Sequence, residues 1–163
     1  MSQFNTLKNK IFSLENLKIQ TEKWKQAGEK VVFTNGCFDI VHQGHLEVLA
    51  HTADLGSKLI IGLNSDSSIQ KLKGNNRPII EEQSRAILLA SFSFVDAVVL
   101  FSEDTPINLI STLLPDVLAK GGDYKIETIV GHETVQKNGG EVILVPFVDG
   151  FSSTTIIEKI RKS

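Results

Sequence analysis

The sequence lacks the features that mark secreted, membrane-spanning or nucleic-acid-binding proteins. It contains a single cysteine, Cys37, so no internal disulfide can form, as is usual in a reducing compartment. Its longest apolar runs, such as KLIIGL at 58–63, have the length of a strand, and its first ten residues have no apolar centre typical of a signal peptide. A net charge of -2 gives no general attraction for nucleic acid or anionic lipid. We therefore expect a soluble, cytoplasmic protein that binds neither nucleic acid nor a membrane.

The sequence does contain a regular alternation of apolar strands and amphipathic helices. The expected strands, rich in Val, Ile and Leu, cover residues 30–34, 58–64, 96–101, 116–120 and 141–146. The expected helices cover residues 14–27, 45–55, 81–92, 106–114, 128–137 and 154–161, with Gly56 and Gly139 as C-caps and serines capping the last helix. Continuous apolar strands are typical of parallel sheets that are covered on both faces. The pattern predicts an α/β fold, a single Rossmann-like doubly wound parallel sheet with helices on both faces.

The length of 163 residues suits one domain, and no repeat or long linker divides the chain. We expect residues 1–28 to form an N-terminal helical extension and residues 29–163 to form the main domain. The initial methionine favours a stand-alone protein over an excised domain.

The stretch NGCFDIVHQGH, residues 35–45, lies where the first main strand gives way to a helix. In an open parallel sheet, ligands bind at the carboxyl ends of the strands, close to helix N-termini that attract phosphate. His42 and His45 are three residues apart and would share one helix face, with no side chain between them at Gly44. This arrangement predicts a phosphate site, although histidines that only cap the helix would give the same pattern.

Other site chemistries have weaker support in the sequence. A zinc site would need a third ligand, and His51 and His132 have no ligand spacing relative to the first pair. Cys37 has no identifiable partner that would make it a nucleophile, and no GxSxG, Walker or GxGxxG motif is present. The residues that would hold a metal ion stay unknown.

Two motifs resemble the signatures of the HxGH nucleotidyltransferase superfamily: HQGH at 42–45 and FSSTT at 151–155, which is similar to ISSTT. The segments NSDSSIQKLKGNNRPI, FSEDTP, LLPDVLAKGGDY and GGEVILVPF narrow the resemblance to the D-glycero-β-D-manno-heptose 1-phosphate adenylyltransferase domains of ADP-heptose synthases. The similarity covers residues 29–163, which would be the nucleotidyltransferase domain. It implies that ATP and a sugar 1-phosphate are joined to give ADP-heptose and pyrophosphate, with Mg²⁺ as cofactor. A homodimer and a role in lipopolysaccharide core biosynthesis are also implied.

The resemblance assigns roles to individual positions. Its implied catalytic residues are His42, His45 and Lys73, and its implied substrate-phosphate residues are Lys73 and Arg85. The implied nucleotide-binding residues are Thr34, Gly36, Cys37, Phe38, Asp39, Gly44, Lys120, Gly121, Asp123, Ser153 and Thr154. Asp39 would orient a histidine or contact a magnesium shell. The structural alternatives are a solvated loop position for Lys73, an ion pair for Arg85 and N-capping for Ser153 and Thr154.

Two other functions stay open. Related glycerol 3-phosphate cytidylyltransferases carry an arginine before VD and another before ISTT, whereas this chain has Ser93-Phe94 and residues 147–150 there. Cytidylyltransferase activity is therefore the alternative enzymatic function. A nucleotide-binding regulator without catalysis is the alternative from another class, and the presence of His42, His45 and Lys73 argues against it.

Overall fold

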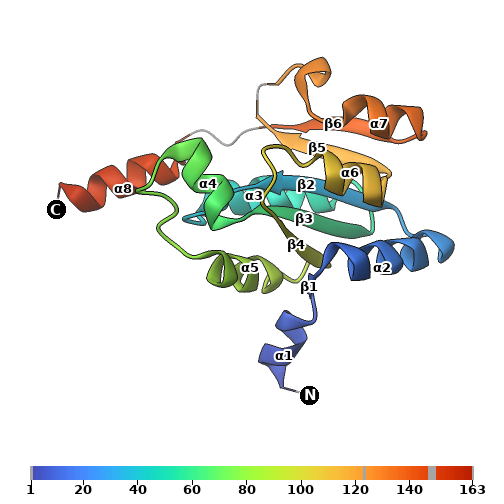
Figure 1. Ribbon diagram of the computed structural model, residues 1–163, viewed down its shortest axis with the longest axis horizontal. Coiled ribbons are helices and arrows are strands. Elements are labelled where there is room, and N and C mark those ends of the chain that lie inside the picture. The colour runs from blue at the N-terminus through green and yellow to red at the C-terminus, as the bar shows by residue number, and fades with distance from the viewer. Residues whose placement is uncertain (1, 123, 147–149, 163) are drawn as a thin grey trace.

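The computed structural model describes residues 2–122, 124–146 and 150–162, and its centre is a six-stranded sheet (Figure 1). All five pairings between neighbouring strands are parallel, in the order β1-β4-β3-β2-β5-β6. The strands are β1 (Ile11–Phe12), β2 (Val31–Gly36), β3 (Lys58–Asn64), β4 (Ala97–Phe101), β5 (Val117–Gly121) and β6 (Glu141–Val145).

Helices precede, connect and follow these strands. They are α1 (Gln3–Lys8), α2 (Leu14–Gln26), α3 (Gln43–Ala53), α4 (Asp66–Lys73), α5 (Glu82–Ala90), α6 (Ile107–Leu113), the 3₁₀ helix η1 (Ile126–Thr128), α7 (His132–Lys137) and α8 (Ser153–Arg161). None of the helices in the described part of the chain has the length and apolar character needed to cross a bilayer. The last helix, α8, projects from the body of the molecule in Figure 1.

The strands form the interior because their side chains are apolar on both faces of the sheet. Val31 and Phe33 of β2 point to one face, where they pack with Leu17 of α2 and residues of α6 and α7. Val32 points to the other face and packs with Leu49 of α3 and residues of α5. Two buried layers therefore cover one sheet, and the predicted doubly wound fold is confirmed.

The strand order fixes where a ligand can bind. From β2 the chain winds outward through β3 to β4, then crosses back to β5 and winds outward to β6 on the other side. The winding direction thus reverses between β2 and β5. At such a switch point the loops after the two strands diverge and leave a crevice at their carboxyl ends.

The structure adds elements that the sequence did not predict. Strand β1 extends the sheet at the edge formed by β4, through Ile11 beside Val98 and Phe12 beside Val99. Helices α1 and α4 were not predicted, and a loop at Lys73 was only the structural alternative to a catalytic role. The predicted helix at 128–137 is broken, because Gly131 adopts φ 87° and α7 begins only after it.

Two predicted caps are wrong. Gly56 lies beyond the C-cap of α3, which is Asp54. A Cβ at Gly56 would lie 2.5 Å from the carbonyl oxygen of Lys30, so a glycine is needed for close packing at this position. At the other end of the chain, the N-cap of α8 is Ser152, and no described side chain caps this helix.

Candidate functional site

A pocket of about 220 Å³ lies at the carboxyl ends of β2 and β5, where the fold predicts a ligand crevice. Most of the predicted site residues line it: Thr34, Gly36, Cys37, Phe38, Asp39, His42, Gly44, His45, Lys73, Lys120, Gly121 and Ser153. Its described lining also contains four residues that sequence reasoning missed: Asn35, Val48, Leu49 and Tyr124. Arg85 and Thr154 lie outside this lining, and Asp123 falls outside the described residues.

In the turn after β2, the ring of Phe38 lies close to Gly36. Phe38 has a φ of 46°, in the left-handed region that residues other than glycine rarely adopt. A Cβ at Gly36 would lie 2.9 Å from the ring of Phe38, so the glycine makes room for this ring. The unusual backbone angle of the turn therefore lies at Phe38, and Gly36 leaves space for the Phe38 ring.

The two signature histidines stand together at the start of α3. His42 is the N-cap of the helix, and its Nδ1 accepts a hydrogen bond from the backbone N–H of His45 at 3.4 Å. Their rings are stacked with centroids 3.8 Å apart at an angle of 21°. The two imidazoles therefore share one face of the helix, as their spacing predicts, and both face the pocket.

Burial favours the neutral form of both imidazoles by lowering the pKa of each. Burial lowers the pKa of His45 to about 4, with smaller contributions from the nearby charges of His42 and Lys73, while the Ile40 carbonyl partly opposes them. Burial also lowers the pKa of His42. A neutral imidazole still donates one hydrogen bond, so the pair can bind phosphate oxygens without carrying charge.

The start of α8 packs directly against this pair. A Cβ at Gly44 would lie 2.8 Å from the Cβ of Phe151, so only a glycine allows the approach. The rings of His42 and Phe151 stack with centroids 6.0 Å apart, and Ser153 Oγ donates to the Ile40 carbonyl at 3.2 Å. The two signature motifs, distant in sequence, thus form one wall of the pocket.

Within the described residues, no side chain caps the helix that forms this wall. Ser153 bonds to the β2–α3 turn and does not cap α8. The first backbone N–H groups of a helix have no partner within the helix, so those of α8 are suited to binding an anion. Thr154 is exposed at the surface of the helix.

A half-buried lysine forms the opposite wall. Lys120 Nζ, at the end of β5, donates to the side-chain oxygen of Asn35 at 3.2 Å and to its carbonyl at 3.4 Å. Its ammonium also lies 5.9 Å from the ring centroid of Tyr124. Burial lowers the pKa of Lys120, and the nearby Cys37 partly opposes this effect. Asn35 is adjacent to the predicted residues Thr34 and Gly36, but its contact with Lys120 is distant in sequence and gave no local signal.

Lys73 reaches the pocket from the end of a helix. It is the last residue of α4 and is followed by Gly74, which has a φ of 90°. The side chain is exposed, lines the pocket and is close enough to lower the pKa of His45. The predicted position beside the histidines is therefore compatible with the structure, while the loop of the structural alternative is a helix.

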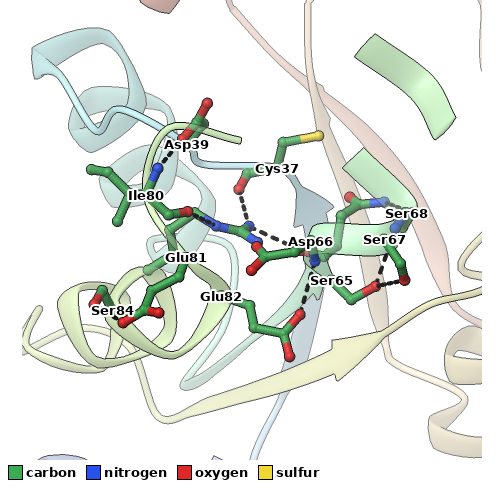
Figure 2. A network of polar contacts seen from close by, with 12 residues as sticks. Cys37, Asp39, Ser65, Asp66, Ser67, Ser68, Ile80, Glu81, Glu82 and Ser84 are labelled. Carbon is green, nitrogen blue, oxygen red and sulfur yellow. Dashed lines mark hydrogen bonds and ion pairs between the residues drawn. The ribbon is translucent and has the colours of Figure 1, made fainter. Parts of the chain in front are cut away.

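Arg85 occupies a different place from the one expected of a substrate-phosphate residue. It is fully buried, and its guanidinium donates to Asp66 Oδ1 and to the carbonyls of Ile80, Cys37 and Asn64, at 2.6 to 2.9 Å (Figure 2). The structure therefore favours the ion-pair alternative for this residue.

Asp39 also differs from expectation, because its carboxylate contacts neither histidine. It accepts hydrogen bonds from Arg77 Nε at 2.5 Å, from the Ile79 amide at 2.8 Å and from the Ile80 amide at 2.9 Å. Burial alone would raise the pKa of this carboxyl, but the two amides and Arg77 outweigh it and hold the pKa below its ordinary value. Asp39 is thus ionised and bound to the segment before α5 (Figure 2).

The described residues contain no group of three or more His, Cys, Asp or Glu side chains placed to hold a metal ion. Both oxygens of Asp39 already accept hydrogen bonds from the chain. The donor set therefore does not match an all-protein metal site.

Comparisons with known proteins identify the family of the chain. The family model described as cytidylyltransferase-like matches residues 33–159. The chain is 52% identical over 155 residues to the Bifunctional protein HldE of Citrifermentans bemidjiense, covering 95% of this chain and 32% of that protein. It is 55% identical over 139 residues to the Bifunctional protein HldE of Geobacter sulfurreducens, covering 85% and 28%. The chain thus spans about a third of the length of these curated relatives.

A solved structure has a similar fold. The crystal structure of the lipopolysaccharide core biosynthesis protein from Thermoplasma volcanium has a TM-score of 0.60 and 29% identity, and the match covers 74% of this chain and 98% of that one. The resemblance carried by HQGH and FSSTT is therefore confirmed. Because the matched region runs from the interior of β2 into α8 and includes both motifs that wall the pocket, the chain belongs to the cytidylyltransferase-like family.

Proposed function

We propose that this protein is an adenylyltransferase that joins ATP and D-glycero-β-D-manno-heptose 1-phosphate to give ADP-heptose and pyrophosphate, for lipopolysaccharide core biosynthesis. The sugar phosphate oxygen attacks the α-phosphorus of ATP, and the bond to the β-phosphate oxygen breaks. The observation that carries the proposal is the joining of the histidine pair and the open start of α8 in one pocket. The solved relative from Thermoplasma volcanium is a lipopolysaccharide core biosynthesis protein, and this likeness supports the pathway.

In this proposal the chain acts by aligning phosphates and stabilising charge on them. The neutral rings of His42 and His45 donate hydrogen bonds to phosphoryl oxygens, and the positive end of the α3 dipole lies beneath them. The amides at the start of α8 bind the β- and γ-phosphates. Lys73 supplies a positive charge beside the histidines. Phosphoryl transfer needs little more from a protein than such positioning and charge stabilisation.

A second hollow provides a place for the sugar. It measures about 210 Å³, shares Asn35, Lys120 and Tyr124 with the main pocket, and continues toward Pro106 and Thr128. Lys120 stands at the boundary between the two. We place the nucleotide phosphates in the main pocket and the hydroxyl-bearing ring of the acceptor in the second hollow, so that the sugar phosphate meets the α-phosphorus near Lys120.

Magnesium enters this proposal as part of the nucleotide substrate. Mg²⁺ commonly keeps several waters and is held by substrate phosphates with one or two carboxylates, so no protein cage is required. Its contribution is to neutralise triphosphate charge before an anionic nucleophile approaches. A cytoplasmic location and a homodimer stay predictions from the resemblance.

Nucleotide preference can be measured without the acceptor. The alternative is the glycerol 3-phosphate cytidylyltransferase activity considered in the sequence analysis. If adenine is the preferred base, ATP at a hundredfold excess over its Kd should raise the melting temperature by about 5 to 10 °C. Differential scanning fluorimetry with ATP and CTP measures both shifts. The same shift with CTP, or a larger one, would support the alternative.

A substitution in the wall of the main pocket tests whether ATP binds there. In Gly44→Ala, the added Cβ would lie 2.8 Å from Phe151 and would displace the start of α8 from the histidines. The stabilisation by ATP should then be largely lost. An ATP shift that survives this substitution would place the nucleotide elsewhere on the protein.

A further inference from the structure

The segment between α4 and α5 is fastened to the pocket by a buried carboxylate. Asp39 is 2% exposed and lies in the turn that carries the histidines. Its three donors, Arg77, Ile79 and Ile80, lie 38 to 41 residues further along the chain. The chain therefore cannot leave the pocket after α4 without breaking three hydrogen bonds to one charged group.

The beginning of α4 is fastened to the same turn by Arg85. This side chain bonds to the first residue of α4 through Asp66 Oδ1 at 2.6 Å and to the pocket turn through the Cys37 carbonyl at 2.6 Å (Figure 2). It also holds the carbonyls of Asn64 and Ile80, each at 2.9 Å. One guanidinium thus joins the end of β3, the start of α4, the start of α5 and the pocket turn.

Lys73 lies between these two attachments. Asp66 begins α4, Lys73 ends it, and Arg77 follows shortly afterwards. Helix α4 is short and continuous, so fixing its first residue and the segment after its last one fixes the direction of Lys73. Since the chain on both sides of Lys73 is fastened to residues 37–39, the lysine and the histidine-bearing turn form one unit.

We propose that Asp39 and Arg85 are positioning residues, which act through Lys73 by holding its helix against the phosphate pocket. They contact neither the nucleotide nor its metal. The inference rests on the proposed function only in that Lys73 contacts the triphosphate. It assigns the aspartate within the FDIVHQGH stretch to the architecture of the pocket, where both of its oxygens already accept hydrogen bonds from the chain.

A double-mutant cycle tests whether Asp39 acts through Lys73. Asp39→Asn, which weakens the bonds to Arg77 and the two amides, should lower kcat/KM for the triphosphate by about tenfold or more, because small displacements of a phosphate-binding group have large effects on rate. In the Lys73→Ala background, the same substitution should lower kcat/KM by less than about twofold. Arg77→Ala, which removes one donor and leaves Asp39 in place, should show the same dependence on Lys73 with a smaller loss.

Asp96→Asn is the matched control. Asp96 also accepts from a cation, Lys58 Nζ at 3.3 Å, and from an amide, Leu59 N at 2.9 Å. It lies at the amino ends of β3 and β4, the opposite edge from the pocket. This variant should melt at a lower temperature and keep normal turnover, and all assays are run well below the melting temperature of the least stable variant.

The outcomes are distinct. Equal losses from Asp39→Asn with and without Lys73 would overturn the inference, because Asp39 would then act independently. A higher magnesium requirement in Asp39→Asn would also overturn it, because it would make Asp39 a metal ligand. A wild-type protein without turnover would contradict the proposed function instead. The cycle is then measured on the dissociation constant of ATP, where the same dependence on Lys73 is expected and its absence overturns the inference.

Discussion

His45→Ala is expected to lower turnover by a hundredfold or more while changing the affinity for ATP only slightly. A hydrogen bond that strengthens as charge develops on the phosphoryl oxygens accelerates the reaction without tightening ground-state binding. Losses of this size are typical when one such donor is removed from a site that is shielded from water. Steady-state kinetics and isothermal titration calorimetry on the same preparation measure the two quantities.

The structure separates this effect from helix capping. The side chain that caps α3 is that of His42, which accepts from the backbone N–H of His45, so His45→Ala leaves the cap in place. His51→Ala is the matched control, since this histidine lies exposed on the same helix. It should retain normal turnover. A His45→Ala protein with near-normal turnover would show that the pair is structural.

Arg85→Ala is expected to lower the free energy of unfolding by about 3 kcal/mol, the low end of the usual cost of breaking a buried charge pair, because the remaining partner, Asp66, is 33% exposed. The substitution leaves the Asp66 carboxylate without its cation and the carbonyls of Cys37, Asn64 and Ile80 without a donor. It also removes the hydrogen bonds that connect the pocket turn, through Arg85, to the start of α4. Chemical denaturation measures the change.

An exposed ion pair serves as the control for this loss of stability. Lys137→Ala removes a surface ion pair with Glu133, formed between successive turns of α7, and should leave the midpoint of denaturation nearly unchanged. If Arg85 contacts the sugar phosphate, as the resemblance implies, Arg85→Ala should fold with nearly normal stability and lose affinity for the acceptor. That result would contradict the structural role.

The fold could be predicted from the sequence because its main strands are continuous apolar runs with a clear boundary. KLIIGLN, for example, coincides with β3 from Lys58 to Asn64. Helix α4 escaped notice because DSSIQKLK is mostly polar, with only Ser68 and Ile69 buried. Strand β1 is two residues long, too short for any periodicity to show.

The sequence could predict only those parts of the candidate site that depend on residues close together in the chain. The spacing of His42 and His45 on a helix start determines their shared face, and the structure shows them stacked. The roles of Asp39 and Arg85 depend on partners far along the chain, such as Arg77 for Asp39 and Cys37 for Arg85. No local pattern reveals such pairings. A charged residue in a signature stretch is therefore interpreted as a ligand until its buried partners are known.

The formation of ADP-heptose is the most direct measurement of the central claim. The protein is incubated with magnesium, ATP and D-glycero-β-D-manno-heptose 1-phosphate, and pyrophosphate and the nucleotide sugar are quantified together, with CTP and glycerol 3-phosphate as the competing pair. We expect one pyrophosphate for each ADP-heptose formed, and little product from the competing pair. Faster reaction of CTP with glycerol 3-phosphate, or ATP binding without product from any pair, would contradict the proposed activity.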